Sequence, residues 1–133
     1  MPSEASHAPP APSKAAPLPK PSEETLKLWF PAQARTGFLK APKFRIVCFH
    51  NAGSSESVYT GKGLRQTSDN PFVLHCNKNG GELLAVQLPG RDARRAEPRH
   101  RSLKPYCEQI YPVLAPLLQD EAVPYVIVAH SMG

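Results

Sequence analysis

The clearest candidate for chemistry in the sequence is a serine on a tight turn that follows an apolar run. Residues 125–133 read YVIVAHSMG, so Ser131 has an alanine two residues before it and a glycine two residues after it. A nucleophilic serine on a sharp strand-to-helix turn requires small residues at these positions, because the backbone bends closely around it. The spacing predicts a nucleophile elbow centred on Ser131, with a chance match after any strand as the alternative.

A second loop could supply part of the same site. A hydrolytic serine needs backbone N–H groups to stabilise an oxyanion, one after the nucleophile and one from the loop after an earlier strand. Met132 is the candidate for the first donor, and Ala52 in the small, glycine-containing stretch HNAGSS is the candidate for the second. An ordinary connecting turn is the competing interpretation of that stretch. His130 is not expected to be the general base, because adjacent residues on a strand point to opposite sides.

The elements around these loops have the pattern of an α/β fold. Three apolar runs predict strands buried on both faces: FRIVCFH (44–50), ELLAVQL (82–88) and YVIVAH (125–130). Between the first two, Asn70 is the expected N-cap, Pro71 the first helical position and Gly80 the end of a helix. Between the last two, apolar residues recur at helical spacing after Ser102. We therefore predict a parallel sheet with crossover helices, whose loops at the strand ends hold the site.

Length and composition limit the remaining possibilities. The 133 residues suffice for one domain. Residues 1–22 are rich in proline and alanine and are expected to form a disordered leader, which leaves 23–133 as the ordered part. Three scattered cysteines argue against a disulfide framework or a zinc site. No run is long enough to span a membrane, so a cytoplasmic location is expected, with organelle targeting by the leader as the alternative.

Four stretches together carry a family resemblance. The sequence has LWF at 28–30, RIVCFHNAGSSESVY at 45–59, ELLAVQLPGRDARRAEP at 82–98 and VAHSMG at 128–133. This combination resembles the stand-alone (type II) thioesterases of polyketide and nonribosomal peptide synthesis, within the α/β-hydrolase superfamily. The family usually has proline at the position of His50 and a second glycine at that of Ser54. The segment TGKGLRQTSDN (60–70) looks like an insertion.

The resemblance implies a reaction, a substrate and a sheet order. The reaction is hydrolysis of an acyl thioester carried on the phosphopantetheine arm of a carrier protein, with Ser131 as nucleophile and Ala52 and Met132 as oxyanion donors. No metal and no cofactor are expected, since the phosphopantetheine belongs to the substrate. The family's sheet places the strand at 44–50 between the other two.

The order of the catalytic residues bears on what the chain can do alone. In this fold the acid and the base follow the serine along the chain, so we expect the sequence to be the N-terminal half of a thioesterase domain. Loss of the base costs on the order of 10⁶ in turnover, and the chain is expected to be inactive alone. The alternative is a non-catalytic, hydrolase-like fragment that binds a carrier protein or another partner.

Positive charge is concentrated in one loop. The chain carries a net charge of +5, and the stretch GRDARRAEPRHR (90–101) is rich in arginine. Arg91, Arg94 and Arg95 are candidate contacts for an acidic carrier protein, with a solvated loop as the alternative. Nucleic acid is not an expected partner, because no aromatic residues alternate with these arginines.

Overall fold

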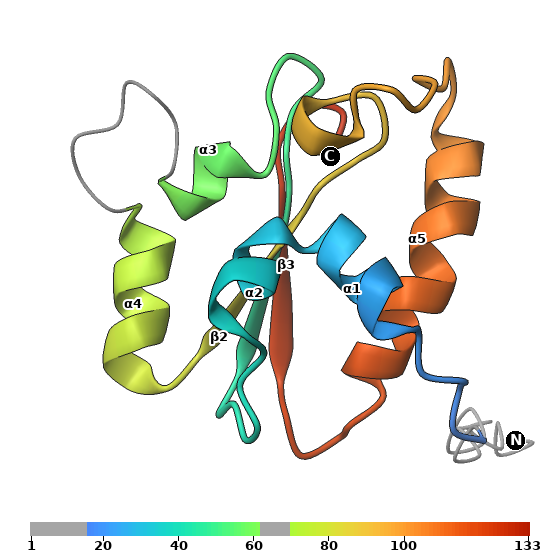
Figure 1. The fold of residues 1–133 in the computed structure, drawn as a ribbon. Helices are drawn as coiled ribbons and strands as arrows, with labels where there is room; N and C mark the ends of the chain where they lie inside the picture. The colour runs from blue at the N-terminus through green and yellow to red at the C-terminus, as the bar shows by residue number, and fades with distance from the viewer. Residues whose placement is uncertain (1–15, 62–69) are drawn as a thin grey trace, which may run out of the picture.

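A parallel sheet of three strands runs through the centre of the computed structural model, which describes residues 16–61 and 70–133 (Figure 1). Strand β1 (Arg45–Phe49) lies between β2 (Glu82–Val86) and β3 (Tyr125–Ala129), and both neighbours run parallel to it. The predicted order, with the first apolar run in the middle, is confirmed. Each strand ends before its apolar run does, because the last residues of each run already belong to the connecting loops.

Helices cover both faces of the sheet (Figure 1). On one face, α3 (Ser57–Thr60) and α4 (Pro71–Asn79) pack on Ile46 and Cys48 of β1. On the other, α1 (Glu23–Trp29) and α5 (Leu103–Leu118) enclose a core that includes Val47. Successive residues of β1 thus face opposite layers, as the period of two requires. Helix α2 (Pro31–Thr36) and the short 3₁₀ helix η1 (Asp92–Arg94) complete the described elements.

The boundaries of α4 follow the local signals in the sequence. The side-chain oxygen of Asn70 accepts a hydrogen bond of 2.9 Å from Phe72 N–H, and Pro71 occupies the first helical position. Gly80 ends the helix with a φ of 72°, a value that glycine adopts without strain. Helix α5 begins directly after Ser102, although the Ser102 side chain makes no capping hydrogen bond.

Strand β3 departs from the prediction of a strand buried on both faces. Tyr125, Val126 and Ile127 are 49%, 54% and 52% exposed. The cause is the position of β3, because no described strand pairs with its outer edge. The outer edge of β2 is covered instead by α2, whose Gln33 side chain donates a hydrogen bond to the Leu83 carbonyl.

The predicted leader falls partly outside the described residues. Residues 1–15 lie outside them, and residues 16–22 contain no helix or strand. The Leu18 N–H donates a hydrogen bond of 2.8 Å to the side chain of Gln119. The leader and the domain boundary at residue 23 therefore stay predictions, and most of the expected insertion (62–69) is likewise outside the description. Among the described helices, none is both long enough and apolar enough to cross a bilayer.

Candidate active site

The two loops singled out in the sequence leave the same edge of the sheet. Phe49 at the end of β1 is in register with Ala129 at the end of β3, so both chains turn at the same level. The backbones also come very close, because a Cβ atom added to Gly133 would lie 2.4 Å from the Phe49 carbonyl oxygen. Only glycine fits there, which gives the last position of the predicted elbow a steric reason.

Each loop closes as a four-residue turn. In the first, Ser54 N–H donates to the Asn51 carbonyl at 3.2 Å. In the second, Gly133 N–H donates to the His130 carbonyl at 3.0 Å. We call these two segments, residues 51–54 and 130–133, the first turn and the second turn.

Ser131 occupies a backbone conformation that most residues avoid. Its φ is 56°, in the left-handed region, where a side chain with a Cβ costs roughly 1–2 kcal/mol. Such strain is typical of functional sites, where the surrounding structure enforces it. The side chain is exposed, and its hydroxyl has no hydrogen-bond partner among the described residues. A strained, accessible hydroxyl at the tip of a strand is what a nucleophile elbow presents.

The candidate oxyanion donors sit inside the two turns. Ala52 follows the first residue of the first turn, and Met132 is the third residue of the second turn. Neither N–H group donates to an acceptor within residues 16–61 and 70–133, whereas the N–H groups that close both turns do. Both amides are therefore uncommitted at the edge of the sheet where Ser131 stands.

Arg91 is buried at this edge, contrary to the expectation that it faces a partner. Its side chain lies between the two turns, and only 8% of the residue is exposed. Both Nε and Nη2 lie 3.4 Å from the Ala52 carbonyl oxygen, and Nη2 lies 3.9 Å from the Met132 sulfur. Nη1 donates to the Pro89 carbonyl at 2.9 Å and to the Tyr106 hydroxyl at 3.4 Å. A guanidinium with all these internal contacts is not available at the surface.

Arg94 is also unavailable to a partner. It is 3% exposed, its Nη1 donates to the Gln87 carbonyl at 2.9 Å, and it forms an ion pair with Glu97. Its guanidinium carbon also lies 4.0 Å from the centre of the Trp29 ring. Of the three candidate arginines only Arg95 lies at the surface. The sequence shows the charge of this loop but not the backbone carbonyls that draw two of its arginines inward.

His50 lies in the region of the site, although the sequence singles it out only because the family usually has proline at this position. It is fully buried, and its Nε2 accepts a hydrogen bond of 3.3 Å from Leu88 N–H. The proton of the neutral ring therefore resides on Nδ1, which donates to the Asn51 carbonyl at 2.9 Å. Burial lowers the pKa of His50 below its ordinary value, and the Arg91 charge adds to this against the opposing effect of the Asn51 hydrogen bond.

The described histidines leave Ser131 without a hydrogen-bonded base. Both ring nitrogens of His50 are engaged. His75 packs against Phe44, and His100 packs against Tyr106. No hydrogen bond joins His130 to Ser131. Within the described ranges, no three His, Cys, Asp or Glu side chains group as metal ligands would.

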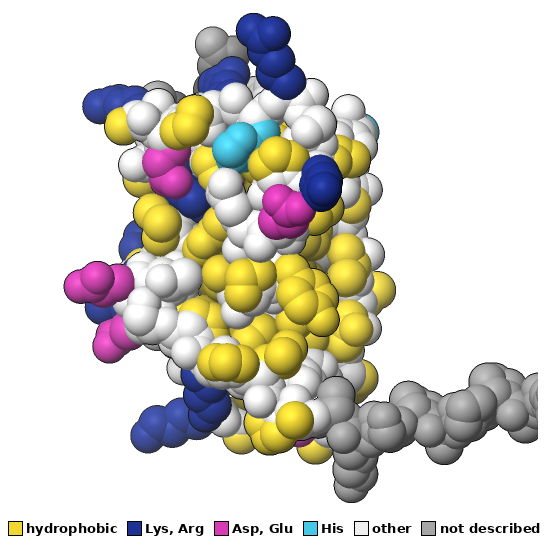
Figure 2. All heavy atoms as spheres, turned by 90° about the vertical axis from the view of Figure 1, so that its right-hand side faces the viewer, with side chains coloured by type: hydrophobic (Ala, Val, Ile, Leu, Met, Phe, Trp, Pro, Cys, Tyr) yellow, Lys and Arg dark blue, Asp and Glu magenta, His cyan; other side chains and the backbone are white. Residues whose placement is uncertain are grey.

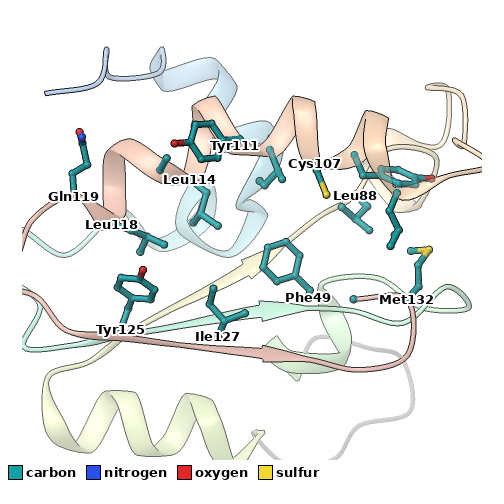
Figure 3. A pocket seen from close by; sticks show the side chains of 15 residues that line it. Phe49, Leu88, Cys107, Tyr111, Leu114, Leu118, Gln119, Tyr125, Ile127 and Met132 are labelled. Atoms are coloured by element: carbon teal, nitrogen blue, oxygen red, sulfur yellow. The ribbon is translucent and has the colours of Figure 1, made fainter. Parts of the chain in front are cut away.

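An apolar groove of about 590 Å³ opens beside the second turn. It lies between α5 and the strands β1 and β3, and Figure 3 shows Leu114 and Leu118 of α5 facing Phe49 and Ile127 across it. Met132 lines the end nearest the candidate site. On the side of the molecule that α5 occupies, Figure 2 shows hydrophobic side chains gathered in the middle of the surface.

Comparison with known proteins finds similarity to a thioesterase and to a synthetase. No family model matches the chain. The chain is 36% identical over 94 residues to a probable cadicidin biosynthesis thioesterase of Streptomyces griseus, an alignment covering 71% of this chain and 22% of that protein. It is 30% identical over 119 residues to the AMB antimetabolite synthetase AmbE of Pseudomonas aeruginosa, covering 90% of this chain and 5% of the synthetase.

A solved structure supports the fold. The type II thioesterase BorB from the borrelidin biosynthetic cluster superposes with a TM-score of 0.52 at 29% sequence identity. The match covers 72% of this chain and 33% of BorB. The chain thus spans less than a quarter of the Streptomyces relative and about a third of the solved one.

Proposed function

We propose that this chain, which is related in sequence and fold to a part of the type II thioesterases, supplies the nucleophile and the oxyanion hole of a serine thioesterase. The observation that carries the proposal is the joint position of Ser131 and two uncommitted amides at the ends of neighbouring parallel strands. The mixed α/β fold and the relatives named as thioesterases agree with it.

The reaction is acyl transfer to the serine, followed by hydrolysis. The Ser131 oxygen attacks the thioester carbonyl carbon, and its proton passes to a general base. The C–S bond then breaks, and the departing sulfur takes up a proton as a thiol. Water attacks the acyl-serine in the second half of the reaction, which releases a carboxylic acid and restores the hydroxyl. In both halves the N–H groups of Ala52 and Met132 face the negative oxygen, and removal of one such donor costs about 3 kcal/mol of barrier.

The proton acceptor is the part of the triad that the described contacts do not provide. None of the described histidines donates to or accepts from Ser131, and His50 uses both ring nitrogens elsewhere. In this fold the acid and the base follow the nucleophile along the chain. We therefore expect these 133 residues to bind and polarise a thioester but not to turn it over by themselves.

The proposed substrate is an acyl group on the phosphopantetheine arm of a carrier protein. Relatives of the chain include a thioesterase and a synthetase of biosynthetic systems, and carrier-bound thioesters are the expected substrates of such an enzyme. Arg95 lies exposed in the loop that follows β2, beyond the buried Arg91 and Arg94. A cation at that place attracts an acidic carrier protein toward the site.

The test joins the chain to the segment that follows the nucleophile in a related thioesterase. The chain is assayed alone and as a fusion to the complementary C-terminal part of BorB, with an acyl-pantetheine thioester and detection of the released acid by mass spectrometry. The fusion is expected to hydrolyse the thioester and to take up a serine-directed fluorophosphonate. Both properties should vanish in Ser131→Ala, and the isolated chain should resemble that variant.

Two results would contradict the proposal. Turnover by a folded fusion that persists in Ser131→Ala would remove the nucleophile from its role. Serine-dependent hydrolysis by the isolated chain would show that one of the histidines upstream of Ser131 acts as the base.

A further inference from the structure

We propose that Arg91 is a positioning residue for the oxyanion hole, because its buried guanidinium joins the first turn to the second turn. The catalytic consequence rests on the proposed function, whereas the connection between the turns is a property of the fold. Nothing in the comparisons assigns a role to this side chain.

The anchor of the guanidinium is rigid. Nη1 donates to the Pro89 carbonyl just after β2 and to the Tyr106 hydroxyl on α5. Tyr106 is itself buried, and its hydroxyl accepts a hydrogen bond of 2.9 Å from His100 N–H. The guanidinium therefore has a fixed position relative to the sheet and to α5, and the two turns can be set against it.

The first turn is held on both sides of Ala52. The Ala52 carbonyl accepts from Nε and Nη2 of Arg91, in the two-pronged geometry that a planar guanidinium offers. The preceding peptide group contains the Asn51 carbonyl and the Ala52 N–H, and this carbonyl accepts from Ser54 N–H and from the His50 ring. With both neighbouring peptide groups fixed, the direction of the Ala52 N–H is fixed too.

The second turn is held by contact with Met132. The Met132 sulfur lies 3.9 Å from Nη2 of Arg91, and a thioether sulfur is a weak hydrogen-bond acceptor. Nη2 of Arg91 contacts both turns. A movement of one turn is therefore transmitted to the other through the planar guanidinium. The close approach of the Gly133 backbone to the Phe49 carbonyl packs this turn against the end of β1.

The positive charge of Arg91 supports the oxyanion hole in addition to its hydrogen bonds. No carboxylate lies within ion-pair distance of Arg91 among residues 16–61 and 70–133, although the residue is buried. A buried cation that contacts the Ala52 carbonyl and the Met132 sulfur raises the positive potential at the two turns. That potential favours an oxygen that becomes negative during the reaction.

Arg94 provides a matched control. It is a buried arginine of the same loop, and it also donates to a backbone carbonyl, but its hydrogen bonds and its ion pair are to Gln87 and Glu97 and not to either turn. Lysine in place of either arginine keeps the positive charge and loses the planar fork. Arg91→Lys and Arg94→Lys therefore differ in whether the turns are connected, while both remove a buried guanidinium.

The first experiment is made on the 133-residue chain by NMR and does not depend on activity. In Arg91→Lys, solvent exchange of the Ser54 amide should accelerate at least about tenfold relative to a β1 amide such as that of Val47. The amide resonances of Ala52 and Met132 should both shift. In Arg94→Lys the exchange rate of the Ser54 amide should change by the same factor as the exchange rates of the β1 amides. Equal behaviour of the two variants at Ser54, Ala52 and Met132 would overturn the proposal.

A measurement on the unsubstituted chain covers the case in which Arg91→Lys does not fold. The Nε–H of Arg91 should give a resonance protected from solvent exchange, with a through-space contact to the first turn. A rapidly exchanging Nε–H without that contact would refute the connection.

The second experiment uses the fusion with turnover that depends on Ser131. Arg91→Lys should reduce kcat by about 10²-fold, comparable to the loss of one oxyanion donor, with little change in KM. Arg94→Lys should leave kcat within about threefold of the parent. A purely structural role would lower stability in both variants without this selective loss of kcat, and such a result would refute the positioning role. If the parent fusion shows no Ser131-dependent turnover, the proposed function fails, while the NMR measurements still decide the role of Arg91.

Discussion

Replacing Ser131 with glycine should make the folded chain more stable, whereas replacing it with alanine should not. Ser131 has a φ of 56°, where any side chain with a Cβ crowds the backbone. Alanine keeps that Cβ and glycine removes it. The Ser131 hydroxyl makes no hydrogen bond to a described residue, so its loss in either variant removes no internal bond.

The magnitude follows from two opposing terms. Relief of the left-handed conformation favours glycine by roughly 1–2 kcal/mol. The greater freedom of glycine in the unfolded chain offsets about 0.4–1 kcal/mol of this. The midpoints of the two terms differ by about 0.8 kcal/mol, and we expect Ser131→Gly to exceed Ser131→Ala by that amount in the free energy of unfolding.

Urea unfolding followed by tryptophan fluorescence measures this difference. The chain contains one tryptophan, Trp29, which is 4% exposed in the core on the α5 side. Arg95 serves as the reference position, because its φ of −59° suits any residue. There the glycine variant should be less stable than the alanine variant. If glycine at position 131 is no more stable than alanine, the backbone at the second turn is not strained, and the elbow interpretation loses its main structural support.

Three further predictions concern the neighbourhood of the site. Gly133→Ala should lower the free energy of unfolding by about 1–3 kcal/mol in the same urea assay, because the new Cβ would meet the Phe49 carbonyl 2.4 Å away; unchanged stability would contradict the close approach. Burial lowers the pKa of His50 below its ordinary value of 6.5, so the unfolded chain binds more protons and stability should fall as the pH drops through that value. His50→Gln should reduce this pH dependence, and an unchanged dependence in that variant would contradict the assignment to His50. In the fusion, Arg95→Glu should raise the KM for a carrier-bound thioester and leave the KM for a pantetheine thioester unchanged. This difference between the two substrates should shrink at high salt. An equal effect on both KM values would place Arg95 in the site rather than at a docking surface.

The parts of the fold that the sequence predicts are those with local causes. Asn70, Pro71 and Gly80 each satisfy a requirement of the helix to which they belong, and α4 has the predicted ends. The residues Ile46 to Cys48 around Val47 are apolar and buried because both faces of β1 are covered. Helices α1, α2 and α3 were not predicted, since they are short and contain few periodic apolar residues.

The parts that the sequence does not predict depend on tertiary surroundings. The apolar run at 125–130 indicates a buried strand, but burial depends on neighbours, and β3 has only one described strand beside it. Arg91 and Arg94 look like solvated charges in an arginine-rich stretch. Their burial results from carbonyl groups of Pro89, Ala52 and Gln87, which only the folded chain places around them. Ser131, Ala52 and Met132 as catalytic groups remain predictions that the geometry accommodates.

The exposed side of β3 has a consequence for how these residues behave in solution. No described strand pairs with its outer edge, and Tyr125 and Ile127 present partly exposed side chains to the groove below α5. An edge of this kind is a template for pairing with another chain. The groove in addition exposes apolar side chains to water. The 133-residue chain should therefore bind a hydrophobic dye such as ANS in its native state and associate as its concentration rises. Dilute samples, or fusion to a segment that covers this face, are the conditions under which its stability can be measured as that of a single molecule.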